Sequence, residues 1–295
     1  MTEYKPGKSA YTLSAELGVE VDAIRKLDAN ENPYGPSPAA LQALCNYRYY
    51  HLYPDADQMA LRRALAGYVG LDMAHIIAGN GSDEVIDFLA TLHRACVVNV
   101  PRRDDFSLDV EEIEHRFRTG EMERAKLLII ASPNNPDGSQ ALPDEIERLL
   151  CLPIIVVLDE AYVEFSGGSL SAWVARFPNL IVLRTFSKWL GLAGLRIGYG
   201  LFPLPIATQV WKIKPPYNVN AAAQVAALAA LSDLAYQESQ KARLLAERER
   251  LYAALQGISF LQVYPSCTNF VLARVRGRPV AQVREALEEA HILVR

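Results

Sequence analysis

The sequence contains few cysteines, and none has the spacing of a disulfide framework or a zinc site. Among its 295 residues are Cys45, Cys96, Cys151 and Cys267, with no C-x-x-C pair and no histidine at ligand spacing. We therefore expect reduced thiols, no bound metal and a cytoplasmic location, because reduced cysteines are typical of that compartment.

Other absences exclude further classes of protein. Thirty basic and 34 acidic residues give a net charge of −4, so no positive field directs the chain to nucleic acid or an anionic membrane. The N-terminus has no basic segment followed by an apolar one, so no signal peptide is visible. The longest uncharged stretch, 215–232, begins with two prolines and is typical of a turn and a buried helix, not a membrane span. A hydrophobic content of 51% indicates a globular chain with a sizeable core.

Short apolar runs alternate with amphipathic helical patterns over much of the chain. β-branched runs separated by helices predict βαβ units, and therefore an α/β fold with a mainly parallel central sheet and helices on both faces. Runs that are apolar at every position fit strands covered on both sides. The runs are IIA (76–78), VVNV (97–100), LLIIA (127–131), PIIVVL (153–158) and LIVLRT (180–185).

Three regions differ in pattern. Residues 1–44 form a predicted N-terminal arm, and residues 1–38 are too rich in prolines and glycines for regular structure to be expected. Residues 45–219 carry the alternating pattern and form the predicted large domain. Residues 220–295 begin with a long helical stretch and continue as strand, strand, helix and strand. This order predicts a small α+β C-terminal domain that also receives the arm.

Polar residues follow the apolar runs, at the sheet edge where ligands bind in open α/β folds. Gly81, Ser82 and Asp83 stand at the start of a helical pattern, where free N–H groups suit an anion. A glycine turn with an ordinary helix cap is the alternative. Asn135, fixed by the proline that follows it, can present its amide to a ligand oxygen; a simple turn is the alternative.

Ionisable residues end the last two runs. Asp159 stands at the end of a buried strand, where a carboxylate needs a cation as partner, and Tyr162 could share its site. A helix N-cap is the alternative for Asp159. Lys188 stands in an apolar, glycine-rich segment, where desolvation makes a lysine nucleophilic toward carbonyls. Arg196 suits bidentate phosphate binding. A snorkelling lysine and a structural arginine are the alternatives.

Taken together, these residues fit pyridoxal phosphate. Lys188 would form the Schiff base, and Asp159 would keep the pyridine nitrogen protonated so that the ring acts as an electron sink. Tyr162 and Asn135 would contact the ring oxygen. The phosphate would lie among Thr185, Ser187, Arg196 and the cup at 81–83.

The sequence resembles the fold-type I pyridoxal-phosphate aminotransferases, and within them the histidinol-phosphate aminotransferases, nearly from end to end. Any one matching segment is a modest pattern, but eight of them follow in family order. They are LDANENPYGPSP (27–38), YPD (53–55), AGNGSDE (78–84), SPNNPDG (132–138), LDEAYVEF (158–165), RTFSKWLGLAGLRIGYG (184–200), WKIKPPYNVN (211–220) and PSCTNFVLA (265–273).

The resemblance implies roles for individual residues. It implies that Lys188 carries the cofactor and shuttles the proton, that Asp159 partners the pyridine nitrogen, and that the other site residues bind the ring oxygen and the phosphate. It further implies a homodimer with shared active sites, in which Tyr53 reaches the phosphate of the neighbouring subunit. Substrate contacts are implied for Tyr4, Asn32, Tyr34 and Arg295.

The implied reaction is ping-pong transfer of an amino group in histidine biosynthesis. L-histidinol phosphate and 2-oxoglutarate would give imidazole-acetol phosphate and glutamate. An aromatic-amino-acid aminotransferase and a threonine-phosphate decarboxylase on the same scaffold stay open, as does a catalytically silent regulatory or binding protein. A dinucleotide-binding module is disfavoured, because Glu84 stands where G-x-G-x-x-G needs its third glycine.

The chain is short of the family pattern in two places. Between Leu89 and Cys96 the family carries a strand and an aromatic residue that stacks on the pyridoxal ring. After Arg295 it carries a further substrate arginine and a last helix. Because the other motifs are intact, we expect the natural protein to contain both segments and its intact mass to exceed 32.7 kDa, whereas a mass of 32.7 kDa would contradict this.

Overall fold

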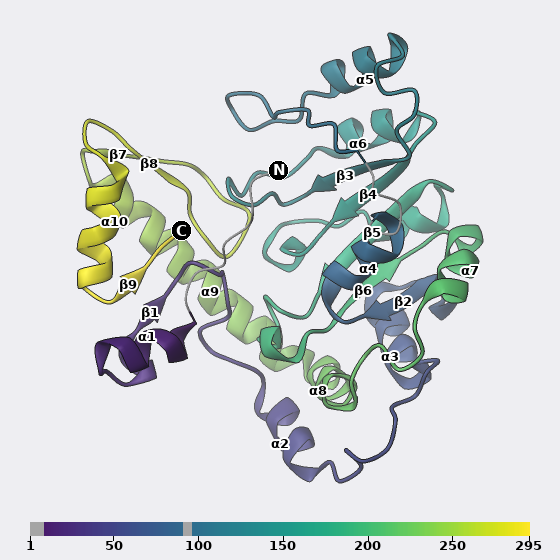
Figure 1. Ribbon diagram of the computed structural model, residues 1–295, viewed down its shortest axis with the longest axis horizontal. Helices are drawn as coiled ribbons and strands as arrows, with labels where there is room; N and C mark the ends of the chain where they lie inside the picture. Colours follow the sequence, from purple (N-terminus) through teal and green to yellow (C-terminus); the bar gives the residue numbers. More distant parts are fainter. Residues whose placement is uncertain (1–8, 91–95) are drawn as a thin grey trace.

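A five-stranded mixed sheet lies at the centre of the fold (Figure 1). The computed structural model describes residues 9–90 and 96–295. The strand order is β2-β6-β5-β4-β3, with β3, β4 and β5 parallel and β6 antiparallel to both of its neighbours. The predicted α/β fold with a mainly parallel sheet is therefore confirmed. The strands are β2(Ile76–Gly79), β3(Leu127–Ala131), β4(Ile155–Asp159), β5(Leu180–Thr185) and β6(Gly198–Leu201).

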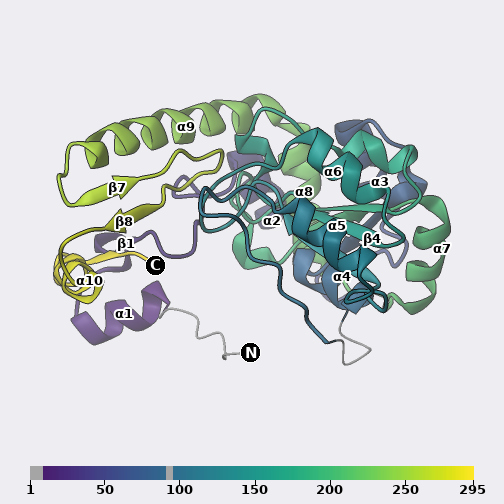
Figure 2. The same cartoon turned by 90° about the horizontal axis from the view of Figure 1, so that it is seen from above.

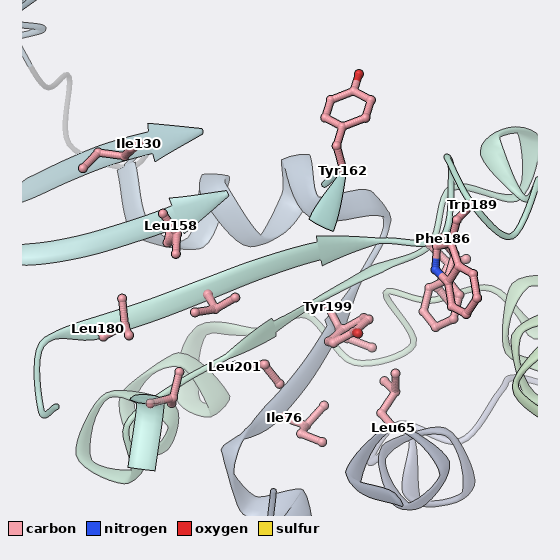
Figure 3. Packing of buried hydrophobic residues seen from close by; sticks show 14 of the residues in the cluster. Leu65, Ile76, Ile130, Leu158, Tyr162, Leu180, Phe186, Trp189, Tyr199 and Leu201 are labelled. Carbon is pink, nitrogen blue, oxygen red and sulfur yellow. The ribbon is translucent and has the colours of Figure 1, made fainter. Parts of the chain in front are cut away.

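Helices cover both faces of this sheet. Successive residues of β4 point to opposite sides: Val156 and Leu158 belong to the core cluster that includes residues of α3 and α6, and Val157 belongs to the cluster that includes residues of α4 and α7. Figure 3 shows the first of these two cores, with residues such as Leu180 and Leu201 along the strands. The helices are α1(Ala10–Leu17), α2(Pro38–Asn46), α3(Met59–Val69), α4(Gly81–Ala90), α5(Val110–Arg118), α6(Pro143–Leu150), α7(Leu204–Ile213), α8(Ala221–Ser232), α9(Leu234–Gln256) and α10(Val280–Glu289).

The prediction of a strand at 97–100 is wrong. Within the described residues this run pairs with no strand, and Val97 and Val98 are 70% and 50% exposed. An apolar run becomes a strand only where a neighbour takes up its backbone hydrogen bonds. The described neighbour of β3 is β4 alone, so β3 forms an edge on which Ile129 is 48% exposed.

Strand β6 was not predicted, because it reads Gly-Tyr-Gly-Leu and glycine disfavours strands. Its glycines serve close packing. A Cβ on Gly198 would lie 2.5 Å from the backbone nitrogen of Ser82. The missing side chain therefore lets the N-terminus of α4 approach β6, which places that helix end at the edge of the sheet.

The N-terminal region holds more regular structure than expected. Residues 10–17 form α1, so the prediction that 1–38 lacks regular structure is wrong there. The side chain of Ser9 accepts a hydrogen bond from the N–H of Thr12, and Gly18 ends the helix with a φ of 65°. The N-cap at Ser9 and the C-cap at Gly18 thus define a helix within a region of prolines and glycines.

The C-terminal third joins the central sheet to two small sheets (Figure 2). Helix α8 packs against α2 and α3, and α9 runs from there toward β7(Leu261–Val263) and β8(Ala273–Val275), which pair antiparallel. β9(Ile292–Leu293) pairs in parallel with β1(Arg25–Lys26) of the predicted arm. The boundaries at 44 and 219 stay predictions. Every helix within the described ranges is too short or too polar to cross a membrane.

Candidate active site

A cleft of about 470 Å³ opens where β3, β4 and β5 end. Because parallel strands bring their carboxyl ends to one edge, the residues that follow them meet there. The N-terminus of α4 and the segment around Ala29 close its other sides. Predicted site residues on its wall are Ser82, Asp83, Asn135, Asp159, Tyr162, Thr185, Ser187, Lys188 and Arg196.

Lys188 reaches into this cleft from the loop after β5. Its Nζ donates a hydrogen bond to the carbonyl oxygen of Ala29 at 2.9 Å and lies 5.6 Å from the ring centroid of Tyr162. Burial lowers the pKa of the Lys188 amine, because desolvation disfavours its charged form. A larger unprotonated fraction makes this amine a better nucleophile and proton acceptor.

Asp159 is the last residue of β4 and lies deep in the cleft. Its carboxylate accepts a hydrogen bond from the N–H of Ala161 at 3.0 Å. Burial raises the pKa of Asp159 to about 6. A buried carboxylate of this kind is stabilised by a cation next to it, such as a protonated pyridine nitrogen.

Tyr162 extends beyond the strand ends, as Figure 3 shows. Its hydroxyl oxygen accepts hydrogen bonds from Nδ2 of Asn30 at 3.0 Å and from Nδ2 of Asn135 at 3.3 Å. Burial raises the pKa of Tyr162, so the side chain is a neutral phenol at neutral pH. Asn135 was predicted from the sequence, but Asn30 was missed, because its only signal was its place in the segment 27–38.

The start of α4 and Arg196 form a cup for an anion. Free N–H groups at a helix N-terminus attract phosphate, and a guanidinium adds positive charge. Nη2 of Arg196 lies 2.7 Å from Oδ2 of Asp83. The hydroxyls of Thr185 and Ser187, 3.0 Å apart, add two further polar groups to the cleft wall. This set of donors fits the phosphate of pyridoxal phosphate.

Gly81 gives Arg196 the space it occupies, and this leads to a prediction. Gly81 has a φ of 82°, and a Cβ there would lie 2.6 Å from Nη2 of Arg196. We expect Gly81→Ala to weaken pyridoxal phosphate binding about tenfold or more, since displacement of the arginine from the phosphate costs about 1.4 kcal/mol or more. Fluorescence titration with pyridoxal phosphate measures this. Gly120→Ala is the control, because Gly120 has the same φ and no atom within 4 Å of its Cβ position; equal losses in both variants would contradict the role of Gly81.

A buried ion pair lies on the other face of the sheet, directly behind the cleft. Glu160 and Arg184 each neighbour a cleft residue in sequence, and adjacent residues of a strand point to opposite faces. Nε of Arg184 donates to Oε2 of Glu160 at 3.1 Å, and both side chains are almost fully buried. This pair ties the ends of β4 and β5 together, which fixes Asp159 relative to Thr185.

Other predicted residues lie outside this cleft. Tyr53 is 83% exposed and stacks on Tyr217, with ring centroids 4.7 Å apart. Asn32 is buried, and its amide donates to the carbonyl oxygen of Trp189 at 2.9 Å. The ring of Tyr34 lies 4.0 Å below the guanidinium of Arg243.

Two further predicted substrate residues lie near the chain ends. Arg295 is described and exposed, and it is not among the residues that line the cleft. Tyr4 lies outside the described residues. The stretch between Leu89 and Cys96, where the family carries its stacking aromatic, lies largely outside them as well.

Comparison with known proteins places these residues in a family. The profile of the family "Aminotransferase class I and II" matches residues 23–98 and 89–295. A histidinol-phosphate aminotransferase of Roseiflexus castenholzii is 46% identical, over 99% of this chain and 86% of its own. The chain belongs to the histidinol-phosphate aminotransferase family. The chloroplastic histidinol-phosphate aminotransferase 1 of Arabidopsis thaliana is 44% identical over 100% of this chain and 76% of its own.

The fold agrees with a solved histidinol-phosphate aminotransferase. The crystal structure of the Sinorhizobium meliloti protein in complex with pyridoxal-5'-phosphate superposes with a TM-score of 0.87 at 28% identity. The match covers 99% of this chain and 86% of that chain. The resemblance read from the motifs is thereby confirmed, and so is the fold-type I assignment.

The comparisons also show that a relative contains residues that this chain lacks. The two stretches matched by the family profile meet at 89–98. The alignment with the Roseiflexus relative extends over 324 positions, more than the 295 residues of this chain. The Roseiflexus relative therefore contains residues without a counterpart in this chain.

Proposed function

We propose that this chain is a pyridoxal-phosphate-dependent aminotransferase that transfers the amino group of L-histidinol phosphate to 2-oxoglutarate. The observation that carries the proposal is a single cleft that holds a desolvated lysine, a buried carboxylate, a phenol and an anion cup. Pyridoxal phosphate, when bound, supplies the electron sink that makes the substrate's α-proton acidic. Family membership supports this chemistry over the aromatic-amino-acid aminotransferase and decarboxylase alternatives.

Each cleft residue has a proposed role that follows from its chemistry. Lys188 would hold the cofactor through its amine, and the same Nζ would act as general base and then general acid for the proton that leaves the substrate's α-carbon, in a 1,3-transfer. Burial lowers the pKa of that amine, which raises its unprotonated fraction at a given pH. Asp159 holds the proton on the pyridine nitrogen, and Tyr162 with Asn135 orients the ring oxygen. The cup at 81–83, Thr185, Ser187 and Arg196 hold the phosphate.

Substrate contacts are proposed from the segments beside the cleft. We propose Arg295 for the phosphate of the substrate, because a guanidinium binds phosphate oxygens in a bidentate way. Asn32 and Tyr34 act in this proposal by holding the segment 29–34 in place, since the amide oxygen of Asn32 accepts from the N–H of Tyr34 at 3.0 Å. From the family resemblance we also propose that Tyr4 closes over the site of a neighbouring subunit.

A homodimer is part of the same proposal. Tyr49, Tyr50, Leu52 and Tyr53 are 59%, 56%, 55% and 83% exposed, and together they form a patch of apolar surface. Patches of this kind are typical of protein interfaces. Because Tyr53 does not line the cleft of its own chain, we propose that it reaches the phosphate cup of a second copy. The cytoplasmic location expected from the reduced cysteines stays a prediction.

The substrate test is a comparison of kcat/KM values with 2-oxoglutarate as acceptor. We expect L-histidinol phosphate to exceed L-phenylalanine by about 100-fold or more, because a site that binds a phosphate rejects substrates that leave its charges unpaired. An equal or higher value for L-phenylalanine would make the chain an aromatic-amino-acid aminotransferase. Release of carbon dioxide from L-threonine phosphate would make it a decarboxylase.

A further inference from the structure

Asn30 contacts the site through Tyr162, yet the proposed function leaves Asn30 itself without a role. Its Nδ2 donates to the hydroxyl oxygen of Tyr162 at 3.0 Å. The two residues lie on segments far apart in the chain, one in the arm and one after β4. A side-chain contact over that separation fixes the phenol from a part of the fold that the central sheet does not control.

The backbone around Asn30 is held on several sides. Asn30 has a φ of 54°, a left-handed conformation that asparagine and glycine tolerate better than other residues. Its carbonyl oxygen accepts from Nδ2 of Asn269 at 3.1 Å. The preceding carbonyl, of Ala29, accepts from Nζ of Lys188. Two residues further on, Asn32 is anchored to Trp189. Asn30 is therefore presented to Tyr162 in a defined position.

The phenol ring is held from the C-terminal side as well. Phe270 packs edge-on against Tyr162, with ring centroids 5.2 Å apart. The neighbouring Asn269 is partly buried, and its Oδ1 has no hydrogen-bond partner among the described residues. The segment 269–270 thus meets both Tyr162 and Asn30, so ring and amide are fixed relative to each other.

The hydrogen-bond roles at Tyr162 follow from the donors around it. The side-chain NH2 groups of Asn30 and Asn135 only donate, so the hydroxyl oxygen accepts from both. A phenol has two acceptor positions and one proton. With both acceptor positions taken, its own proton is left to donate elsewhere, and the cleft is the open side.

We propose that Asn30 is a positioning residue that keeps Tyr162 a hydrogen-bond donor toward the ring oxygen of pyridoxal phosphate. This inference rests on the proposed function, because it assigns a purpose to the phenol only if that cofactor binds. Asn30 does not touch the reacting atoms and acts through Tyr162. A donated hydrogen bond stabilises the anionic form of the ring oxygen, so it holds down the pH at which the bound cofactor changes its visible absorption.

The experiment measures the midpoint pH of that visible absorption in the loaded protein. In Asn30→Asp the carboxylate accepts the phenol's proton instead of donating to its oxygen, so the donor toward the cofactor is lost. We expect the midpoint to rise by about one pH unit, a tenfold change in proton affinity. Asn30→Gly suits the φ of 54° and removes only the amide. We expect a smaller rise in the same direction.

Tyr162→Phe supplies the matched background. If Asn30 acts through the phenol, Asn30→Gly adds nothing to the midpoint of Tyr162→Phe, and Asn30→Asp adds only the direct effect of its charge. The charged groups that face Tyr162 and contribute to that direct effect are Asp159, Lys188 and Arg295, with Glu31, Asp83 and Arg196 on the cleft wall. Thermal unfolding of the cofactor-free variants shows whether each still folds.

The outcomes separate this inference from the function it rests on. A visible band in the unaltered protein, a raised midpoint in both Asn30 variants and no effect of Asn30→Gly in Tyr162→Phe would establish the role of Asn30. A band whose midpoint is the same with and without the Asn30 amide would overturn this inference alone. Shifts of the same size in both backgrounds would also overturn it, since they would bypass the phenol. No visible band in the unaltered protein would overturn both proposals.

Discussion

Replacement of Lys188 by alanine should lower kcat/KM for L-histidinol phosphate by about 10⁴-fold or more. The substitution removes the amine that holds the cofactor and moves the proton. Nζ of Lys188 lies in the cleft within hydrogen-bond distance of Ala29 and 5.6 Å from the centre of the Tyr162 ring. Asp159 on the same wall is an acceptor, but it lies at the pyridine nitrogen in the proposed arrangement and is not positioned to move this proton.

Lys188→Arg separates the need for a mobile proton from the need for positive charge. Arginine keeps the charge and much of the length, but its guanidinium does not lose a proton in proteins. We therefore expect the arginine variant to be as inactive as the alanine variant. Stopped-flow absorbance with L-histidinol phosphate measures both. Retention of more than about a hundredth of the original rate by either variant would contradict the assignment, since general acid–base groups contribute about 10²-fold at least.

Replacement of Asp159 by asparagine should lower activity and raise the stability of the cofactor-free protein at the same time. The amide oxygen of asparagine still accepts from the N–H of Ala161, but a neutral amide does not hold a proton on the pyridine nitrogen. We expect kcat/KM to fall by about 10²- to 10³-fold, the range typical of losing one charged group at a transition state.

The stability effect has a definite sign and pH range. Burial raises the pKa of Asp159 from 3.8 to about 6. The folded state therefore binds more protons than the unfolded state in this range, and stability falls as pH rises from about 4 to 6. Above that range the ionised Asp159 carboxylate lowers the free energy of unfolding by up to about 3 kcal/mol. The asparagine variant has no such carboxylate and keeps that stability.

Urea unfolding of the two cofactor-free proteins at pH 4.5, 6 and 8 checks this. The stability advantage of Asp159→Asn should grow between the first two pH values and then level off. Burial likewise raises the pKa of Glu164 to about 7, but that contribution is common to both proteins and cancels. If Asp159→Asn were less stable than the original at pH 8, the ionised Asp159 would not destabilise the cofactor-free fold, and this prediction would be wrong.

Much of the fold follows from short-range sequence patterns. The runs that became β2, β4 and β5 are apolar at successive positions because both faces of the sheet are covered there, so hydropathy alone located them. The run at 97–100 looks the same in sequence but pairs with no described strand, since pairing depends on a neighbour and not on the run itself. Strand β6 shows the opposite case. Its sequence does not resemble a strand, because its glycines are needed for the close approach of α4.

The site residues likewise fall into those that the sequence predicted and those that it did not. Residues at or just after the strand ends, such as Asp159 and Lys188, were predictable because the ends of parallel strands converge. Asn30 was not, because its contact with Tyr162 depends on how the arm crosses the sheet edge. The pair of Glu160 and Arg184 was missed for a related reason, since nothing local in the sequence shows that two charged residues meet behind the cleft.

The most direct test of the proposed aminotransferase is a half-reaction without any keto acid. Protein loaded with pyridoxal phosphate is mixed with excess L-histidinol phosphate, and released imidazole-acetol phosphate is measured by mass spectrometry. We predict a burst of about one equivalent per site, because the amino group stays with the enzyme until an acceptor takes it. Adding 2-oxoglutarate should then restart product release and form glutamate. No product, or continuous release without 2-oxoglutarate, would contradict the proposed activity.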